Sequence, residues 1–158
     1  VEEAIRLGDR DSWIEARPVC GGQPLFEYQL DYGPESPIVP RTCAMQLSPD
    51  AFRRELAPCR TFMLKAEADW LVARGIGRRT RIQDLLIYGA DGPIDNHERF
   101  PDECARHKLL DMVGDLTLAG CDLVGAFTAH RSGHRLNAEL VRVLASRSEG
   151  MDRQKRCA

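Results

Sequence analysis

The chain has 158 residues, 22 Lys and Arg against 24 Asp and Glu, a net charge of −2, and 43% hydrophobic residues. These values are typical of an ordinary soluble globular protein, and they give no reason to expect a nucleic-acid or membrane partner. No apolar run approaches the length of a membrane span, and no signal peptide is visible.

Alternation of apolar and polar residues predicts short strands at the start of the chain, because successive side chains of a strand face opposite sides. Gly and Pro clusters separate these strands, as turns require. The strands are expected at residues 4–7, 13–17, 26–32 and 43–47.

Helix signals begin at Ser48, which precedes Pro49 in the pattern of an N-cap followed by the first helical residue. A short helix is therefore expected at 49–56. The elements expected next are a strand at 60–64, a helix at 65–74 before Gly75, a strand at 85–88 and a turn at 89–93.

The longest predicted helix begins at Pro101 and runs to about Ala119, with Gly120 beyond its end. This order of elements suits an α+β fold, in which a mainly antiparallel sheet and helices on one of its faces form a two-layer sandwich. The elements expected after this helix are a strand at 122–129, a connection at 130–134, a helix at 136–146 and a charged tail or linker at 147–158.

His107, Asp111 and Asp115 recur at every fourth position in the longest helix, so their side chains lie in one polar line. Imidazole and carboxylate groups are good ligands for zinc or another divalent metal. The first two residues would be the ligands, and Asp115, one turn further on, could orient a ligand or a partner histidine. A solvated helix face, or a self-satisfied histidine–aspartate pair, is the alternative.

Three further residues are candidates for stabilising charge. Lys108 could bind a phosphate or an oxyanion, or be a surface lysine. His134, in a tight loop after Gly133, could act as a general acid, or be an exposed histidine at a helix start. Thr61 could hydrogen-bond an oxyanion, or bond its own backbone.

The six cysteines form no C-x-x-C pair, so we expect reduced thiols and a cytoplasmic protein rather than a disulfide framework. The chain begins at Val1, without Met and already in a strand-like alternation. We therefore expect it to be a piece of a longer protein.

Three motifs together resemble one family, the UDP-3-O-acyl-N-acetylglucosamine deacetylases of lipid A biosynthesis. The motifs lie at 60–62, 99–116 and 132–137, and the resemblance runs in the family's order from about Glu2 to Leu144. It implies that residues 1–146 are the second of two similar α+β domains, with a βαβ insert at about 57–88.

The resemblance implies a zinc-dependent amidohydrolase that removes acetate from UDP-3-O-acyl-N-acetylglucosamine, the committed step of lipid A and hence lipopolysaccharide synthesis. It also implies a role for each candidate. These are His107 and Asp111 as zinc ligands, His134 as the catalytic histidine supported by Asp115, Lys108 and Thr61 as groups that contact substrate or oxyanion, and Phe62 in an apolar passage for the acyl chain.

The third zinc ligand of the family, a histidine, and its general-base glutamate belong to the first domain, which these 158 residues do not include. We therefore expect this chain alone to bind zinc weakly and not to turn over substrate. Some family members carry a dehydratase domain after this point, so a fusion beyond the tail is also considered. The alternative function is a non-catalytic module that binds a nucleotide sugar or a partner protein without a metal.

Overall fold

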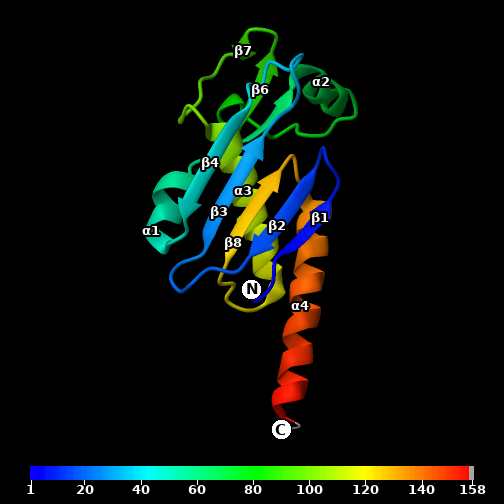
Figure 1. The fold of residues 1–158 in the computed structure, drawn as a ribbon. Coiled ribbons are helices and arrows are strands. Elements are labelled where there is room, and N and C mark those ends of the chain that lie inside the picture. The colour runs from blue at the N-terminus through cyan, green and yellow to red at the C-terminus, as the bar shows by residue number, and fades with distance from the viewer. Residues whose placement is uncertain (157–158) are drawn as a thin grey trace.

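The computed structural model describes residues 1–156, with side chains described for residues 1–147. Within that range the expected α+β fold is confirmed, because a mixed five-stranded sheet is covered on one face by the helices α3 (Glu103–Leu116) and α4 (His134–Arg156) (Figure 1). The strand order is β1-β2-β8-β3-β4, antiparallel throughout except between β3 and β8. The strands are β1 (Ile5–Gly8), β2 (Trp13–Arg17), β3 (Leu25–Leu30), β4 (Arg41–Gln46) and β8 (Ala126–His130).

A second, three-stranded sheet forms the insert, which lies at one end of the main sheet (Figure 1). Its first two strands pair in parallel and are joined through a helix, so the expected βαβ unit is confirmed. The turn predicted at 89–93 is present at residues 90–91 and leads into a short third strand, which pairs antiparallel with the second. The elements are β5 (Thr61–Leu64), α2 (Lys65–Ala73), β6 (Leu85–Gly89) and β7 (Gly92–Pro93).

The predicted N-cap at Ser48 is confirmed, since its hydroxyl accepts a hydrogen bond of 3.1 Å from the backbone N–H of Ala51. Helix α1 (Pro49–Ala51) continues directly as a π-helical turn (Phe52–Leu56), so the chain is helical over the whole expected segment.

Helix α3 (Glu103–Leu116) carries the polar line, and a 3₁₀ turn extends it to Ala119. Gly120 ends the turn in the left-handed conformation with φ 69°, as the sequence predicted. Helix α4 (His134–Arg156) begins two residues before its predicted start and continues through most of the predicted tail. Residues 157 and 158 lie outside the described chain.

Several predicted strand boundaries were wrong, and two of the differences have a clear cause. Strand β8 starts at Ala126 instead of residue 122, because neither neighbour offers a ladder beyond that point: β2 ends before Pro18, and β3 begins after Pro24. Strand β3 ends at Leu30, after which the Asp31 carboxylate accepts a 2.7 Å hydrogen bond from the Gly33 N–H and turns the chain.

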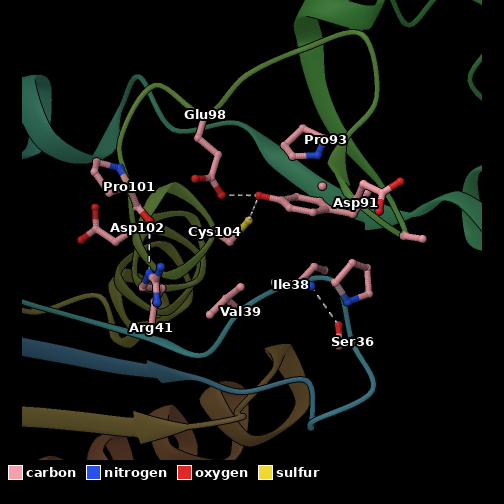
Figure 2. A pocket seen from close by; sticks show the side chains of 14 residues that line it. Ser36, Ile38, Val39, Arg41, Asp91, Pro93, Glu98, Pro101, Asp102 and Cys104 are labelled. Carbon is pink, nitrogen blue, oxygen red and sulfur yellow. Dashed lines mark hydrogen bonds between the residues drawn. The ribbon is translucent and has the colours of Figure 1, made fainter.

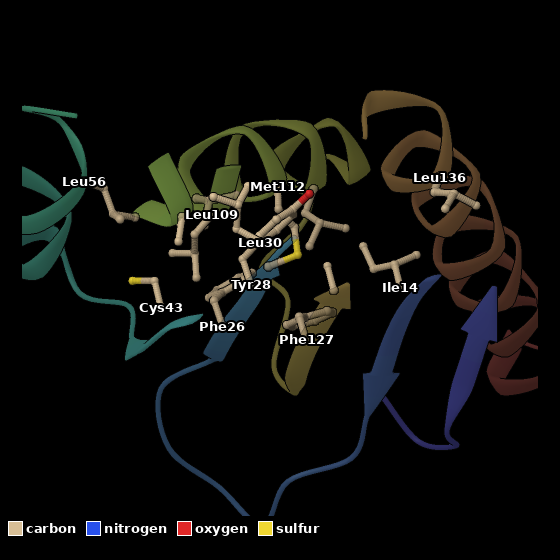
Figure 3. Packing of buried hydrophobic residues seen from close by; sticks show 14 of the residues in the cluster. Ile14, Phe26, Tyr28, Leu30, Cys43, Leu56, Leu109, Met112, Phe127 and Leu136 are labelled. Atoms are coloured by element: carbon tan, nitrogen blue, oxygen red, sulfur yellow. The ribbon is translucent and has the colours of Figure 1, made fainter. Parts of the chain in front are cut away.

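The core lies between the main sheet and the two long helices (Figure 3). The Phe26 and Phe127 rings, on the parallel pair β3 and β8, stack with centroids 5.1 Å apart. Leu109 and Met112 of α3 are fully buried against this face of the sheet, and Leu140 of α4 closes the core at its side. The apolar residues of α3 therefore bind it to the sheet, and its polar line is left outside the core.

Three of the five described cysteines are buried, and all five are free thiols. Cys157 lies outside the described residues. Among the helices that the structure describes, none combines the length and the apolar character needed to cross a membrane.

We predict that Leu109→Ala lowers the free energy of unfolding by about 2–5 kcal/mol, because Leu109 is completely buried and its truncation leaves a cavity. Leu118→Ala is the matched control, since Leu118 is 72% exposed and its truncation should cost at most about 0.5 kcal/mol. Urea denaturation followed by circular dichroism measures both. Equal losses for the two variants would contradict the assigned core.

Candidate metal-binding and catalytic site

Helix α3 brings His107, Lys108 and Asp111 together on one face. The two oxygens of Asp111 have different neighbours: Oδ1 lies 3.5 Å from His107 Nε2, and Oδ2 accepts a hydrogen bond of 2.8 Å from Lys108 Nζ. All three side chains are about one-fifth exposed or less. The Lys108 ammonium thus balances the Asp111 charge on the side away from the histidine.

The His107 ring sits in a site suited to a neutral imidazole. Burial lowers its pKa below the ordinary value, outweighing the neighbouring Asp111 carboxylate, which raises it. Among the described side chains, His107 Nδ1 is the one buried polar atom without a hydrogen-bond partner. The Cys59 backbone lies close enough to raise the pKa, although the geometry falls short of a hydrogen bond. A neutral ring is the form that binds a metal.

The spacing of His107 and Asp111 fits two ligands of one zinc ion. Ligand atoms held about 2.0–2.2 Å from a tetrahedral zinc lie about 3.4 Å apart, close to the observed 3.5 Å between Nε2 and Oδ1. Among the residues whose side chains the structure describes, no third His, Cys, Asp or Glu joins them in a group able to hold a metal. The residues present therefore fit part of a zinc site and leave it one protein ligand short of the usual catalytic set.

Asp115 and His134 form a second pair, although they belong to different helices. His134 is the first residue of α4, and its Nδ1 lies 2.8 Å from Asp115 Oδ2 in the last turn of α3. The His134 ring is 71% exposed, so packing holds it only weakly. A carboxylate at Nδ1 leaves the other ring nitrogen, Nε2, free to face a substrate.

Asn137 belongs to this arrangement, and sequence reasoning assigned it no role. Its amide Nδ2 donates a hydrogen bond of 2.8 Å to the same Asp115 oxygen that His134 contacts. Asn137 follows His134 by three residues on α4, so the two side chains share a helix face. That spacing is the signal that could have found it.

Phe62 links the His107 ring to an apolar groove. Its ring meets the His107 ring edge-to-face with centroids 6.1 Å apart, and it meets the Tyr32 ring in the same manner at 5.8 Å. The groove has a volume of about 590 Å³ and starts at this point. Its lining consists of Tyr32, Phe62, Met63, Ala66, Glu67, Trp70 and Leu71.

The remaining candidates lie apart from these contacts. Thr61 is exposed at the start of β5, next to Phe62, and among the described residues its hydroxyl makes no hydrogen bond to the other candidates. The two other histidines of the chain have different contacts. His130 stacks on Trp13, and the backbone carbonyl of His97 accepts a hydrogen bond from Arg60.

A buried ion pair fixes the insert to the helix that carries the site. The Arg60 guanidinium donates two hydrogen bonds of 2.9 Å to the Glu103 carboxylate, and the backbone N–H of Arg60 donates a third. Glu103 is completely buried, and Arg60 is 8% exposed. Burial alone would raise the pKa of Glu103, but the hydrogen bonds from Arg60 and from the Arg99 N–H hold it below its ordinary value.

A second cavity, of about 430 Å³, lies where residues 36–41 meet the β6–β7 hairpin and the start of α3 (Figure 2). The Tyr88 hydroxyl donates a hydrogen bond to Glu98 there and lies 3.1 Å from Cys104 Sγ. Burial raises the pKa of the Cys104 thiol to about 12, which makes it a poor nucleophile. None of the candidate site residues lines this cavity.

Comparison with known proteins identifies one family. The sequence profile described as LpxC, UDP-3-O-acyl N-acetylglycosamine deacetylase, matches residues 1–146. The UDP-3-O-acyl-N-acetylglucosamine deacetylases of Brucella ovis, Brucella canis and Brucella suis are each 39% identical over 147 residues. Each match covers 91% of this chain and 50% of the relative, so the chain spans about half the length of the curated relatives it matches.

We predict that Glu103→Gln lowers the free energy of unfolding by about 3–5 kcal/mol, because it leaves the buried Arg60 charge without its partner. Glu139→Gln, which removes an exposed partner of Arg135, is the control and should cost less than about 1 kcal/mol. Thermal unfolding at neutral pH compares them.

The Arg60–Glu103 pair should also contribute to the dependence of the free energy of unfolding on acid pH. Since the folded protein holds the pKa of Glu103 below its ordinary value of 4.5, its contribution is complete above that pH and is lost as the pH falls through the folded pKa. The Glu103→Gln variant should lack this part of the acid dependence. An unchanged slope of stability against pH would contradict the assignment.

Proposed function

The chain belongs to the UDP-3-O-acyl N-acetylglycosamine deacetylase family, and we propose that it supplies one part of a zinc-dependent active site. The proposed reaction is hydrolysis of the N-acetyl group of UDP-3-O-acyl-N-acetylglucosamine to UDP-3-O-acyl-glucosamine and acetate, in the cytoplasmic synthesis of lipid A. The observation that carries the proposal is the His107–Asp111 spacing, one helical turn from the Asp115–His134 pair.

In this proposal His107 Nε2 and Asp111 Oδ1 hold the zinc ion, and a domain outside these 158 residues completes its ligand set with a histidine and supplies the general-base glutamate. Lys108 keeps the second Asp111 oxygen hydrogen-bonded, so that Oδ1 is the oxygen left for the metal. When bound, zinc supplies a Lewis acid for the amide carbonyl and lowers the pKa of water.

His134 is the proposed proton donor. Asp115 holds its Nδ1, so in the protonated ring the Nε2 proton points to the substrate. That proton first stabilises the developing oxyanion and then passes to the leaving glucosamine nitrogen as the C–N bond breaks. Thr61 and Lys108 stabilise the same oxyanion. The Thr61 hydroxyl donates a hydrogen bond to it, and the Lys108 ammonium is a fixed positive charge nearby.

The groove beyond Phe62 is the proposed site of the 3-O-acyl chain. Its rim is aromatic, with Tyr32 and Trp70 each about half exposed, and its floor carries Met63 and Leu71. Burying an alkyl chain there is favourable by about 0.8 kcal/mol per methylene. Because Phe62 contacts both the groove and His107, a chain bound in the groove places the sugar next to the metal ligands.

We predict that the isolated 158-residue chain binds zinc weakly and releases no acetate from UDP-3-O-acyl-N-acetylglucosamine, because the described residues offer two ligands where catalytic zinc usually has three. Calorimetric zinc titration and an acetate-release assay on the purified chain measure this. Turnover near that of a complete family member would contradict the proposed division of the site.

In the complete protein, Asp111→Ala should remove the bound zinc and lower kcat/KM by more than about 100-fold, since even outer partners of a metal site contribute about 10–100-fold. Asp50→Ala is the control, because Asp50 is exposed and pairs only with Arg53. Metal content and deacetylase activity are measured together. If Asp111→Ala leaves UDP-sugar binding intact and the wild type carries no zinc, the non-catalytic module is the correct function instead.

A further inference from the structure

A buried chain of hydrogen bonds runs from the sheet to the Asp115–His134 pair. The Tyr28 hydroxyl donates to the Ser132 carbonyl, and the Ser132 hydroxyl donates to Asn137 Oδ1 over 2.7 Å. Asn137 Nδ2 then donates to Asp115 Oδ2 over 2.8 Å. Asn137 is 1% exposed and Ser132 is 3% exposed, whereas the His134 side chain at the end of the chain is 71% exposed.

The donor and the acceptor can be assigned for each hydrogen bond around Asn137. A carboxylate oxygen can only accept, so the Asn137 group facing Asp115 must be the amide NH₂. The Asn137 oxygen therefore faces Ser132, whose hydroxyl proton it accepts. Asp115 thus fixes which way the Asn137 amide is turned, and the Ser132 hydroxyl, by donating to the amide oxygen, holds the Asn137 side chain in place.

We propose that Asn137 is a positioning residue that acts on His134 through Asp115. Asp115 Oδ2 accepts from both Asn137 and His134, so the Asn137 bond holds that oxygen where His134 Nδ1 meets it. Without this bond the Asp115 carboxylate rotates about its side-chain torsion and loses the orientation of the imidazole. Packing covers little of the His134 ring. The contact between His134 Nδ1 and Asp115 Oδ2 is therefore the main restraint on the ring.

The inference rests on the proposed deacetylase function for its effect on catalysis, but its geometric content is independent of that function. Among the described residues, the Asn137 side chain makes no hydrogen bond to His134, His107 or Asp111, so its loss should not alter metal content. It should change how often the His134 Nε2 proton points to the substrate, which affects the chemical step more than substrate binding.

The test is a double-mutant cycle in the complete, zinc-loaded protein. Asn137→Ala should lower kcat by about 10–100-fold, the range found for residues that orient a catalytic or metal-bound histidine, with KM and zinc content unchanged. In an Asp115→Ala background the same substitution should have almost no further effect, because the group through which it acts is gone. Ser146→Ala, which removes a hydroxyl elsewhere on α4, is the control and should keep full activity.

A milder pair of variants keeps the test valid if Asn137→Ala does not fold. Ser132→Ala removes the hydrogen bond that holds the Asn137 oxygen, so it loosens the Asn137 side chain and should lower kcat in the same direction, whereas Ser132→Thr keeps the hydroxyl and should restore it. Imidazole ¹⁵N shifts, recorded with His134 neutral, report which ring nitrogen carries the proton. The wild type should hold it on Nδ1, and Asn137→Ala and Ser132→Ala should both lower that population.

The outcomes separate the two proposals. A wild type with no deacetylase activity refutes the proposed function, and the ¹⁵N shifts then decide the positioning role alone. Full kcat in Asn137→Ala, an additive loss in the Asp115→Ala background, or an unchanged His134 tautomer in both variants would overturn the role of Asn137.

Discussion

The Arg60 guanidinium and the Glu103 carboxylate meet inside the protein, where the insert joins the first turn of α3. Glu103 lies one turn before His107, and Arg60 is followed directly by Thr61 and Phe62. The pair therefore fixes the strand that begins the groove to the helix that carries the proposed metal ligands. Burying two charges is costly, but leaving either of them alone is more costly still, so the two elements form and pack together.

The candidate site residues of α3 form two groups that lie one helical turn apart. His107, Lys108 and Asp111 form one cluster, and Asp115 one turn later serves the start of α4. The apolar face of the same helix is buried against the sheet. The polar line therefore lies outside the hydrophobic core. An exposed His134, and a His107–Asp111 pair without a third ligand among the described residues, are what the proposed half-site requires.

The sequence was sufficient to predict features that depend on residues close together in the chain. The four-residue spacing on α3, the Ser48 cap and the Gly120 helix end were all predicted, because each depends on neighbours within one or two turns. The parallel pairing of β3 with β8, the two aromatic residues at the groove rim and the bond from Asn137 to Asp115 join segments far apart in the chain. No local sequence pattern specifies which distant partner such residues meet. These three features could therefore be found only in the structure.

The central claim is that His107 and Asp111 are zinc ligands. Anomalous X-ray diffraction at the zinc edge, on crystals of the complete protein grown with zinc, tests it most directly. The account predicts one strong peak about 2.0–2.2 Å from both His107 Nε2 and an Asp111 oxygen. A fully occupied zinc bound by other residues, with Asp111 still paired only to His107 and Lys108, would contradict it.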